Sequence, residues 1–365
     1  MNQPKGAPLA DQADAAPRAV SSTPSDGAEL VDQMTRPAAS RHGDRSDGPR
    51  RQGGNHADAP GRPLARSAAL PRARRRHNLK GYLFVSPAVV LFLAFIAVPI
   101  AGIVVFSFLQ WDLLTPPKFA GLANFRMLAH DPVLGQALFN SLIFDLMTTS
   151  LHIIVGMTLA IAVTSVSSRA VRYWARTAFV VPFLMSAGAV AVMWGYILSG
   201  STGPLNYYLE RLRMSPPDWL ASGTWALPSL VGVDLWQTVG ITFIIFLVGL
   251  QTIPSVLYEA AAIDGVGAWQ RFRHITFPML SPATLVASVT AFIGAFEIFT
   301  WPYVITNGGP GNATLTIMVY IFRVAFRNLQ LGYGAAVSIV NLVVLVTLVM
   351  IGLGFARRWV HYERV

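Results

Sequence analysis

Residues 82–109 read YLFVSPAVVLFLAFIAVPIAGIVVFSFL, twenty-eight consecutive positions without a charged side chain. A helix needs about 20 mostly apolar residues to cross the hydrocarbon core of a bilayer. Five further stretches pass the same test, at about 138–166, 174–199, 226–251, 279–305 and 335–356. The sequence therefore predicts an all-α membrane protein with six transmembrane helices.

The composition of the 365-residue chain agrees with lipid as its solvent. Hydrophobic residues make up 53% of the sequence and charged residues only 13%, whereas a soluble domain carries about 25% charge. Prolines inside several apolar stretches are compatible with spanning helices, because neighbouring helices can satisfy the freed backbone carbonyls. The chain has no cysteine, which excludes disulfides and thiolate metal sites.

Residues 1–77 differ from the rest of the chain. They contain no Phe, Trp or Tyr and are rich in Ala, Pro, Gly, Asp and Arg. Such a stretch buries too little apolar surface to offset its chain entropy, so we expect a disordered cytoplasmic tail followed by a membrane domain over 78–365. The basic run 72–80 directly precedes the first apolar stretch. It can contact anionic membrane lipid or serve only as a topology signal.

The positions of Lys and Arg predict an orientation, because cytoplasmic loops carry an excess of both. With the N-terminus inside, the loops at the cytoplasmic side hold eight basic residues and the outside loops hold six. The six basic residues from Arg66 to Lys80 raise the first number to 14. We therefore expect both termini in the cytoplasm. Half of the 28 Lys and Arg residues lie in positions 1–80, so the basic excess belongs to a tail and loop ends, and no nucleic-acid partner is expected.

The cytoplasmic loop 252–278 contains the run EAAAIDGVGAWQRFRHITFP from Glu259 to Pro278. Ser255 is a suitable N-cap, and the alanines favour a short helix up to Asp264. The glycines that follow permit a sharp turn that a β-carbon would obstruct. A second short helix is then expected to end at Pro278. A rigid helix–turn–helix of this size can insert into a groove of another protein.

This run resembles the EAA motif of the permease subunits of bacterial ABC importers. Val266 departs from the pattern, which usually has a small residue there. The resemblance implies that the matching residues, together with Gly267, couple the chain to a separate ATPase. The positions that fit are Glu259, Ala260, Ala261, Asp264, Gly265, Phe272, Ile275 and Pro278.

Further segments resemble the sugar-type permeases related to the maltose and glycerol-3-phosphate systems. They are GYLFVSPAVV from Gly81, FAGLANF from Phe119, TNGGP from Thr306 and YIFRVAF from Tyr320. The resemblance covers about 80–360. It implies the permease fold of ABC type I importers in a bacterial cytoplasmic membrane. Within that family the chain is similar to the larger maltose permease subunit without its periplasmic insertion.

The resemblance also implies partners. They are a second homologous permease subunit, a dimeric ABC ATPase, an extracytoplasmic solute-binding protein and the transported solute. The solute would be a carbohydrate or a related molecule, namely an oligosaccharide, a monosaccharide or glycerol-3-phosphate. The chain itself would form half of the translocation path.

The sequence gives no support for catalysis by this chain. A P-loop needs Gly-Lys-[Ser/Thr] to hold phosphate, and none of the three lysines, Lys5, Lys80 and Lys118, follows a glycine. The zinc-hydrolase pattern His-Glu-x-x-His and a Gly-x-Ser-x-Gly elbow between a strand and a helix are also missing. We therefore expect a non-enzymatic transport subunit that uses no cofactor and no metal.

Polar residues inside the apolar stretches are candidates for the solute path, because ionisable groups at membrane depth usually face a cavity or a partner. Trp236 and Trp301 offer apolar faces to a sugar ring. The same residues can instead bond to a neighbouring helix or to the other permease subunit. Asp145 and His152 lie seven positions apart, so they share a helix face that can look into the path. The solute-path candidates are Trp236, Gln237, Thr238, Gly294, Glu297, Ile298 and Trp301.

Two functions compete with the importer. An ion-coupled secondary transporter could use Asp145 or Glu297 as its coupling carboxylate, but it does not explain the loop from Glu259. A membrane assembly or sensor subunit without transport activity is the other alternative, and no folded soluble domain supports it. The favoured hypothesis is a permease subunit driven by ATP hydrolysis on another chain.

Overall fold

The structure is a computed structural model that describes residues 72–200 and 202–359. Most of the expected tail over 1–77 lies outside the described residues, which begin at Arg72. The chain divides into two units, 1–70 and 71–365, and the description below concerns the second unit. Helix α1 starts at Arg72, so its first six residues, 72–77, fall within the range expected for the tail.

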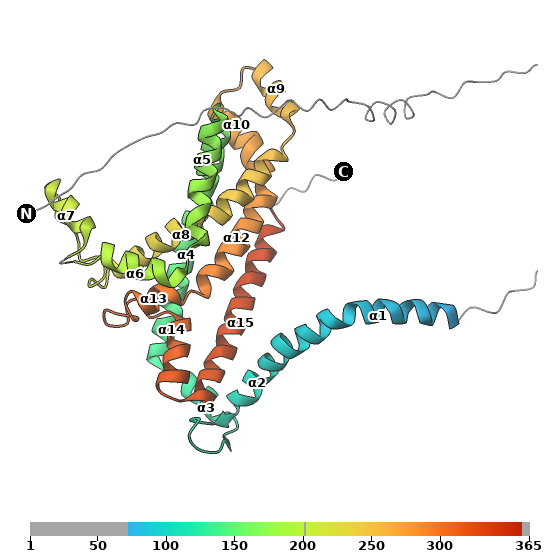
Figure 1. Cartoon of the computed structure of the whole chain (residues 1–365), viewed down its shortest axis with the longest axis vertical. Coiled ribbons are helices and arrows are strands. Elements are labelled where there is room, and N and C mark those ends of the chain that lie inside the picture. Colours follow the sequence, from blue (N-terminus) through green and yellow to red (C-terminus); the bar gives the residue numbers. More distant parts are fainter. Residues whose placement is uncertain (1–71, 201, 360–365) are drawn as a thin grey trace, which may run out of the picture. The chain divides into compact units, whose positions relative to one another are not determined.

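The described residues are mainly helical (Figure 1). The first half contains α1 (Arg72–Phe92), η1 (Leu93–Ala97), α2 (Val98–Ser107), β1 (Leu109–Gln110), β2 (Lys118–Phe119), α3 (Ala123–Leu128), α4 (Pro132–Ser165), α5 (Arg169–Val180), η2 (Val181–Leu184), α6 (Ala187–Ile197) and α7 (Pro204–Arg211). The two short strands pair antiparallel, with Leu109 opposite Phe119.

The second half begins with the long helix α8 and ends with the long helix α15. Its elements are α8 (Ala226–Gln251), α9 (Ser255–Ile263), α10 (Ala268–Arg271), η3 (Phe272–Thr276), α11 (Phe277–Met279), α12 (Ser281–Phe296), α13 (Thr300–Val304), α14 (Ile317–Phe322), η4 (Arg323–Arg327) and α15 (Leu331–Ala356). In Figure 1, α4, α8, α12 and α15 run lengthwise, with α9 and α10 at one end and α3 at the other.

Among the described residues, five helical segments are long and apolar enough to cross a membrane. They are Tyr82–Ser107, Pro132–Ser165, Ala226–Gln251, Ser281–Val304 and Leu331–Ala356. A sixth span exists only if Arg169–Leu184 and Ala187–Ile197, bent by 99°, are counted together. The structure therefore supports five or six spans, and the continuous helix expected over 174–199 is broken.

The break in the third stretch has a local cause. Pro182 carries no backbone N–H and its ring clashes with the preceding turn, so an α-helix does not continue through it. The chain narrows to a 3-10 turn at Val181–Leu184 and starts again as α6 after an extended Ser186. Mean hydropathy does not report this event, because it averages the composition of a stretch and carries no information on the direction of the backbone.

Helix α4 lies in the middle of the packing, against both α8 and α12. Two glycines permit the closest approaches. A β-carbon on Gly156 of α4 would meet the Thr242 hydroxyl of α8 at 2.8 Å, and one on Gly240 of α8 would meet the Phe179 carbonyl of α5 at 2.3 Å. Dispersion contacts and burial favour such tight packing of apolar helices.

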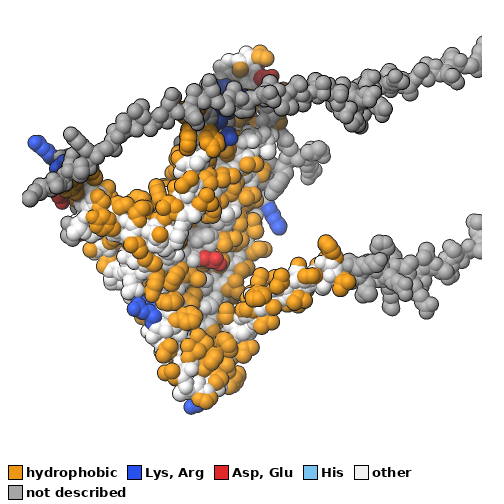
Figure 2. Space-filling model, viewed as in Figure 1, with side chains coloured by type: hydrophobic (Ala, Val, Ile, Leu, Met, Phe, Trp, Pro, Cys, Tyr) orange, Lys and Arg blue, Asp and Glu red, His pale blue; other side chains and the backbone are white. Residues whose placement is uncertain are grey.

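The outer surface of this unit is strongly apolar, and hydrophobic side chains cover most of it in the view of Figure 2. The segment Tyr82–Ser107 is the extreme case, since no side chain from Tyr82 to Phe106 is buried within the described chain. The prolines at 87 and 99 do not interrupt this helix, because a π-turn at Leu93–Ala97 separates them and Pro99 lies in the first turn of α2. Lipid or another protein covers this segment.

The end of the bundle that carries α3 is held together by Asp131, the N-cap of α4. One of its carboxylate oxygens accepts from the backbone N–H groups of Val133 and Leu134. The other accepts from the hydroxyls of Tyr320 on α14 and Tyr333 on α15. Burial raises the pKa of Asp131, but these four hydrogen bonds outweigh it and hold the pKa below its ordinary value.

A tight turn follows α13, at the Asn-Gly-Gly-Pro run of residues 307–310, a composition typical of turns. Asn307 and Gly308 both have positive φ, at 48° and 80°. The side chain of Asn140 on α4 donates to the carbonyls of Asn312 and Leu315, and the backbone N–H of Ile317 donates to Ser141. The segment after the turn is thereby fixed to α4.

We expect Gly240→Ala to destabilise the bundle, because the new methyl group would lie 2.3 Å from the Phe179 carbonyl oxygen. Overpacking of this kind costs about 1–3 kcal/mol. The measurement is the thermal unfolding midpoint of the purified protein in detergent. Gly232→Ala on the same helix is the control, since a β-carbon there would have no heavy atom within 4 Å. Equal midpoints for the two variants would contradict the packing described.

Candidate functional site

Helix α8 carries a polar stripe inside an otherwise apolar segment. Asp234, Gln237, Thr238 and Thr242 are spaced so that they lie along one side of a helix, and Asp234, Gln237 and Thr242 are buried. Because no water is available at membrane depth, such groups must be satisfied by neighbouring helices. Their partners come from α4, α13 and the segment that follows η2.

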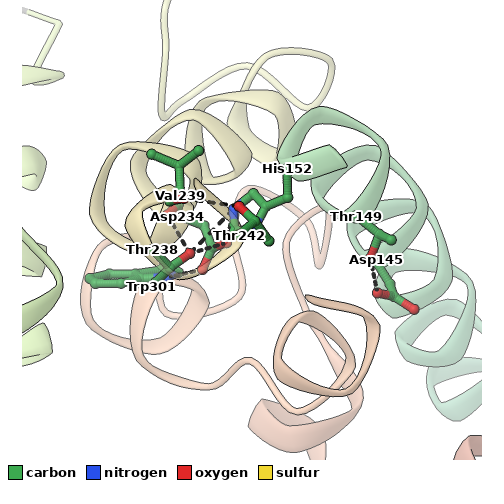
Figure 3. Close-up of polar contacts among 8 residues, drawn as sticks. All are labelled: Asp145, Thr149, His152, Asp234, Thr238, Val239, Thr242 and Trp301. Carbon is green, nitrogen blue, oxygen red and sulfur yellow. Dashed lines mark hydrogen bonds and ion pairs between the residues drawn. The ribbon is translucent and has the colours of Figure 1, made fainter. Parts of the chain in front are cut away.

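Asp234 is the centre of this cluster (Figure 3). Its Oδ1 accepts a 2.9 Å hydrogen bond from the indole N–H of Trp301 on α13. Its Oδ2 lies 3.5 Å from Nε2 of His152 on α4 and 3.3 Å from the Thr238 hydroxyl. The same hydroxyl is 3.2 Å from His152 Nε2. The Asp234 carboxylate thus contacts three side chains, which come from α4, α8 and α13.

A cavity of about 380 Å³ opens beside this cluster. Five of the seven solute-path candidates line it, namely Gln237, Thr238, Gly294, Ile298 and Trp301. Asp234 and His152 line it as well, together with threonines at 242, 290 and 300. No lysine or arginine is among the lining residues. The cavity therefore combines carboxylate, imidazole, amide and hydroxyl groups with a tryptophan.

Gln237 has free hydrogen-bonding capacity in this cavity. Its side-chain nitrogen donates to the Met185 carbonyl at 3.0 Å. Its Oε1 is buried and has no hydrogen-bond partner among the described residues. A buried amide oxygen without a partner is unfavourable, so a ligand hydroxyl that donates to it would be stabilised. The arrangement can therefore bind a molecule rich in hydroxyl groups.

The other two candidates do not line this cavity. Trp236 is partly exposed, and its ring packs edge to face on Trp194 with centroids 5.6 Å apart. Glu297 is exposed and lies at the C-terminal end of α12, where its N–H bonds to the Ile293 carbonyl. Neither side chain takes part in the polar cluster around Asp234.

The shared face expected for Asp145 and His152 does not bring them to one site. His152 lines the cavity, whereas Asp145 is fully buried on α4 and accepts one hydrogen bond from Thr149 at 3.1 Å (Figure 3). Its Oδ2 has no partner among the described residues. Seven residues correspond to about 10 Å along a helix, so only one of the two side chains can reach Asp234.

Asp234 is not among the solute-path candidates predicted from the sequence, although the sequence contains a signal for it. It is the only charged residue between 226 and 251, and an isolated carboxylate in a spanning helix indicates a partner or a cavity. No metal centre is indicated here or elsewhere in the described ranges, where no group of three or more His, Asp or Glu residues could hold an ion.

The loop after α8 forms a compact helical hairpin. Helix α9 begins at Ser255 with Pro254 as its N-cap residue, so Ser255 is not the cap. Gly265 has φ +69°, which a residue with a β-carbon rarely adopts. The hydroxyls of Tyr258 on α9 and Thr276 on η3 lie 3.0 Å apart and join the two arms.

The sequence predicts that the second arm of the hairpin ends at Pro278. In the structure it continues past this residue. Helical residues continue from Ala268 through the π-turn of η3 and α11, and α12 follows at Ser281. The proline is tolerated because it occupies the first turn of α11, directly after the π-turn, where its N–H is not needed. The loop and α12 are therefore nearly continuous.

Helix α9 leaves an apolar side uncovered within the described chain. Val256 and Ile263 are 67% and 87% exposed, and Ala260 lies between them on the same face. Three other expected coupling residues, Glu259, Asp264 and Gly267, are exposed. Ala261 is buried, and Phe272 and Ile275 pack against the core. One side of the hairpin thus holds it to the bundle, and the other is open to a partner.

We expect His152 and Asp234 to be strongly coupled in a double-mutant cycle. Removing one member of a buried pair costs about 3 kcal/mol or more, because the other stays buried without its partner. His152→Gln and Asp234→Asn should therefore each lower the free energy of unfolding in detergent, and the double variant should lose less than the sum.

The control pairs Asp234→Asn with Thr149→Val, because Thr149 bonds to Asp145 and not to the cluster. Those two effects should add within about 0.5 kcal/mol. Additivity in the His152–Asp234 cycle as well would show that the contact contributes no coupling energy.

Comparison with known proteins identifies the class. The profile of the family described as "binding-protein-dependent transport system inner membrane component" matches residues 152–361. The probable ABC transporter permease protein YurN of Bacillus subtilis is 35% identical over 280 residues, covering 75% of this chain and 94% of that protein. The trehalose/maltose transport system permease protein MalF of Thermococcus litoralis is 34% identical, covering 79% and 97%.

A solved structure shows the same fold. It is a chain of a bacterial alginate ABC transporter, crystallised in complex with an alginate pentasaccharide-bound periplasmic protein. Its TM-score is 0.70 at 23% identity, over 79% of this chain and 97% of that chain. The chain therefore belongs to the family of binding-protein-dependent transport system inner membrane components, and it is a multi-pass permease subunit of the sugar-type ABC transporters.

Proposed function

We propose that this chain forms half of the translocation path of an ATP-driven importer for a carbohydrate, and that the loop Glu259–Pro278 couples it to a separate ATPase. The observation that carries the proposal is the connection between the hairpin and the cavity. Three residues join α9 to α8, and the second arm runs almost without a break into α12. Both helices line the cavity through Gln237, Thr238 and Gly294.

A force on the hairpin would therefore move two walls of the cavity. Helices are stiff, and the packed interfaces between helices switch between discrete arrangements. They do not deform continuously. Closure of two ATPase subunits against the hairpin would change the distance between α8 and α12, which supports alternating access. The P-loop missing from the sequence is consistent with a motor on another chain.

The exposed apolar side of α9 suits an ATPase groove. Val256, Ala260 and Ile263 would insert into the groove, with the carboxylates of Glu259 and Asp264 at its margin. Burying this apolar side stabilises a complex roughly in proportion to the area removed from water. On this proposal the hairpin is cytoplasmic, both termini are cytoplasmic, and residues 78–365 form the transport domain.

A second permease subunit completes the path. One chain cannot enclose a solute, and the apolar segment Tyr82–Ser107 has no buried side chain before Ser107. A homologous subunit offers an apolar surface of the kind that covers such a helix. An extracytoplasmic solute-binding protein would deliver the solute from outside.

The chemistry of the cavity supports a carbohydrate solute. Sugars bind through hydroxyl groups that donate and accept hydrogen bonds and through apolar ring faces that pack on aromatic rings. Asp234, Gln237 and Thr238 offer the first kind of contact and Trp301 the second. The relative named for trehalose and maltose transport is in agreement with this solute class.

The coupling role predicts that Gly265→Ala weakens the association of the ATPase. A β-carbon at φ +69° disfavours the turn by about 1–2 kcal/mol, which corresponds to roughly five- to thirtyfold weaker binding. The measurement is copurification of the ATPase with the permease, together with the rate of ATP hydrolysis by the complex. Membrane insertion should be unchanged.

Gly232→Ala is the control, because it lies on α8 outside the hairpin. A β-carbon there would have no heavy atom within 4 Å, and Gly232 has no positive φ. This variant should assemble and hydrolyse ATP like the wild type. Normal assembly and normal coupling with Gly265→Ala would refute the assignment of the hairpin.

A further inference from the structure

A second hollow is lined in part by α3. This helix lies at the end of the bundle opposite the hairpin (Figure 1). The hollow consists of two cavities of about 930 and 540 Å³ that share five lining residues. The shared residues are Ala123, Met127, Asn328, Gln330 and Tyr333. We call this region the outer groove. None of the residues that line the outer groove lines the 380 Å³ cavity described above.

The two carboxylates of the outer groove accept hydrogen bonds from internal donors. Asp131 accepts from two tyrosine hydroxyls and two backbone N–H groups. Asp112 accepts from the backbone N–H of Leu114 and from the N–H and hydroxyl of Thr115, and the hydrogen bonds from Thr115 lower its pKa. Both groups are therefore negative near neutral pH. Asp131 has both oxygens engaged, whereas all three hydrogen bonds to Asp112 end on its Oδ1. The three cations of the groove, Lys118, Arg126 and Arg323, outnumber these two carboxylates.

The cations of the outer groove, in contrast, have no carboxylate partner within the described residues. Lys118 and Arg126 lie at its surface, and Arg323 bonds only to the Asn307 carbonyl and the Asn312 side chain. Across the described ranges the single contact within 4 Å between a basic side chain and a carboxylate is His152–Asp234, which belongs to the other cavity. An open hollow with three such cations favours an anionic surface.

We propose that the outer groove receives an acidic surface of the extracytoplasmic solute-binding protein. This inference rests on the proposed function, which places this end of the chain outside the cell. The solved relative of the same fold was crystallised with a periplasmic protein. The groove is separate from the cavity proposed for the solute, so its charges serve recognition of a protein partner and not passage of the solute.

The proposal makes docking dependent on charge. Complementary charges accelerate encounter and increase specificity, and salt screens them. Arg126 and Lys118 are suitable positions for charge reversal, because neither side chain is buried and neither makes a hydrogen bond or ion pair within the described residues. Arg323 is unsuitable, since it holds the turn at Asn307.

The test uses the complete complex in proteoliposomes, with the solute-binding protein that stimulates ATP hydrolysis by the wild-type complex. For Arg126→Glu combined with Lys118→Glu, we expect about a tenfold rise in the binding-protein concentration that gives half-maximal stimulation. A tenfold change corresponds to about 1.4 kcal/mol. Basal ATP hydrolysis should be unchanged, and the stimulation should depend less on salt.

Arg211→Glu is the matched control. It lies on α7, also on the side expected to face outward, and its guanidinium packs over Tyr207 outside the groove. This variant should behave like the wild type. The same half-maximal concentration and the same salt dependence in the double variant would overturn the proposal. If no binding protein stimulates even the wild-type complex, the proposed function fails, and the inference fails with it.

Discussion

The arrangement of this chain depends on one constraint, which is that a carboxylate at membrane depth needs partners from the protein. Asp234 obtains them from His152 on α4, Thr238 on its own helix and Trp301 on α13. Because these partners come from three helices, the junction fixes how α4, α8 and α13 meet. The cavity lies beside that junction, and Asp234, His152, Thr238 and Trp301 all line it.

The junction also explains how the two ends of the molecule can act on the cavity. Helix α8 leads from the polar cluster to the hairpin, and α12 returns from the hairpin to the opposite wall. Gly156 and Gly240 bring the neighbouring helices into close contact, so α4, α5 and α8 pack as a tight group. At the other end, Asp131 and Asn140 fix the segments that precede α15, through Tyr320 and the carbonyl of Asn312. We therefore expect a displacement of the hairpin to be transmitted through α8 and α12 to the cavity, because few flexible segments lie between them.

Much of this fold could be predicted from the sequence, because lipid imposes simple length and polarity requirements. The stretch 226–251 coincides with α8, and the hairpin with its left-handed Gly265 follows from alanine and glycine placement. The bend after Pro182 could not be predicted, since the hydropathy of a stretch carries no information on the direction of its backbone. Pro278 was misleading for a related reason, because a preceding π-turn lets the helix continue through it.

The site was predicted less completely than the fold. Gln237, Thr238 and Trp301 lie together, but the residue that joins them, Asp234, was not recognised. Asp145 and His152 share a helix face, yet the pattern of one helix does not show which neighbour each turn meets. Trp236 and Glu297 illustrate the same limit, since their positions depend on the packing of α6 and on where α12 ends.

The most direct test of the account is the accessibility of the hairpin. The natural chain has no cysteine, so Asp264→Cys, an exposed position, provides a single thiol for a membrane-impermeant maleimide. The account predicts no labelling in intact cells, labelling in inverted membrane vesicles stripped of the ATPase, and protection when the ATPase is added back. Labelling from outside intact cells, or labelling that the bound ATPase does not reduce, would contradict it.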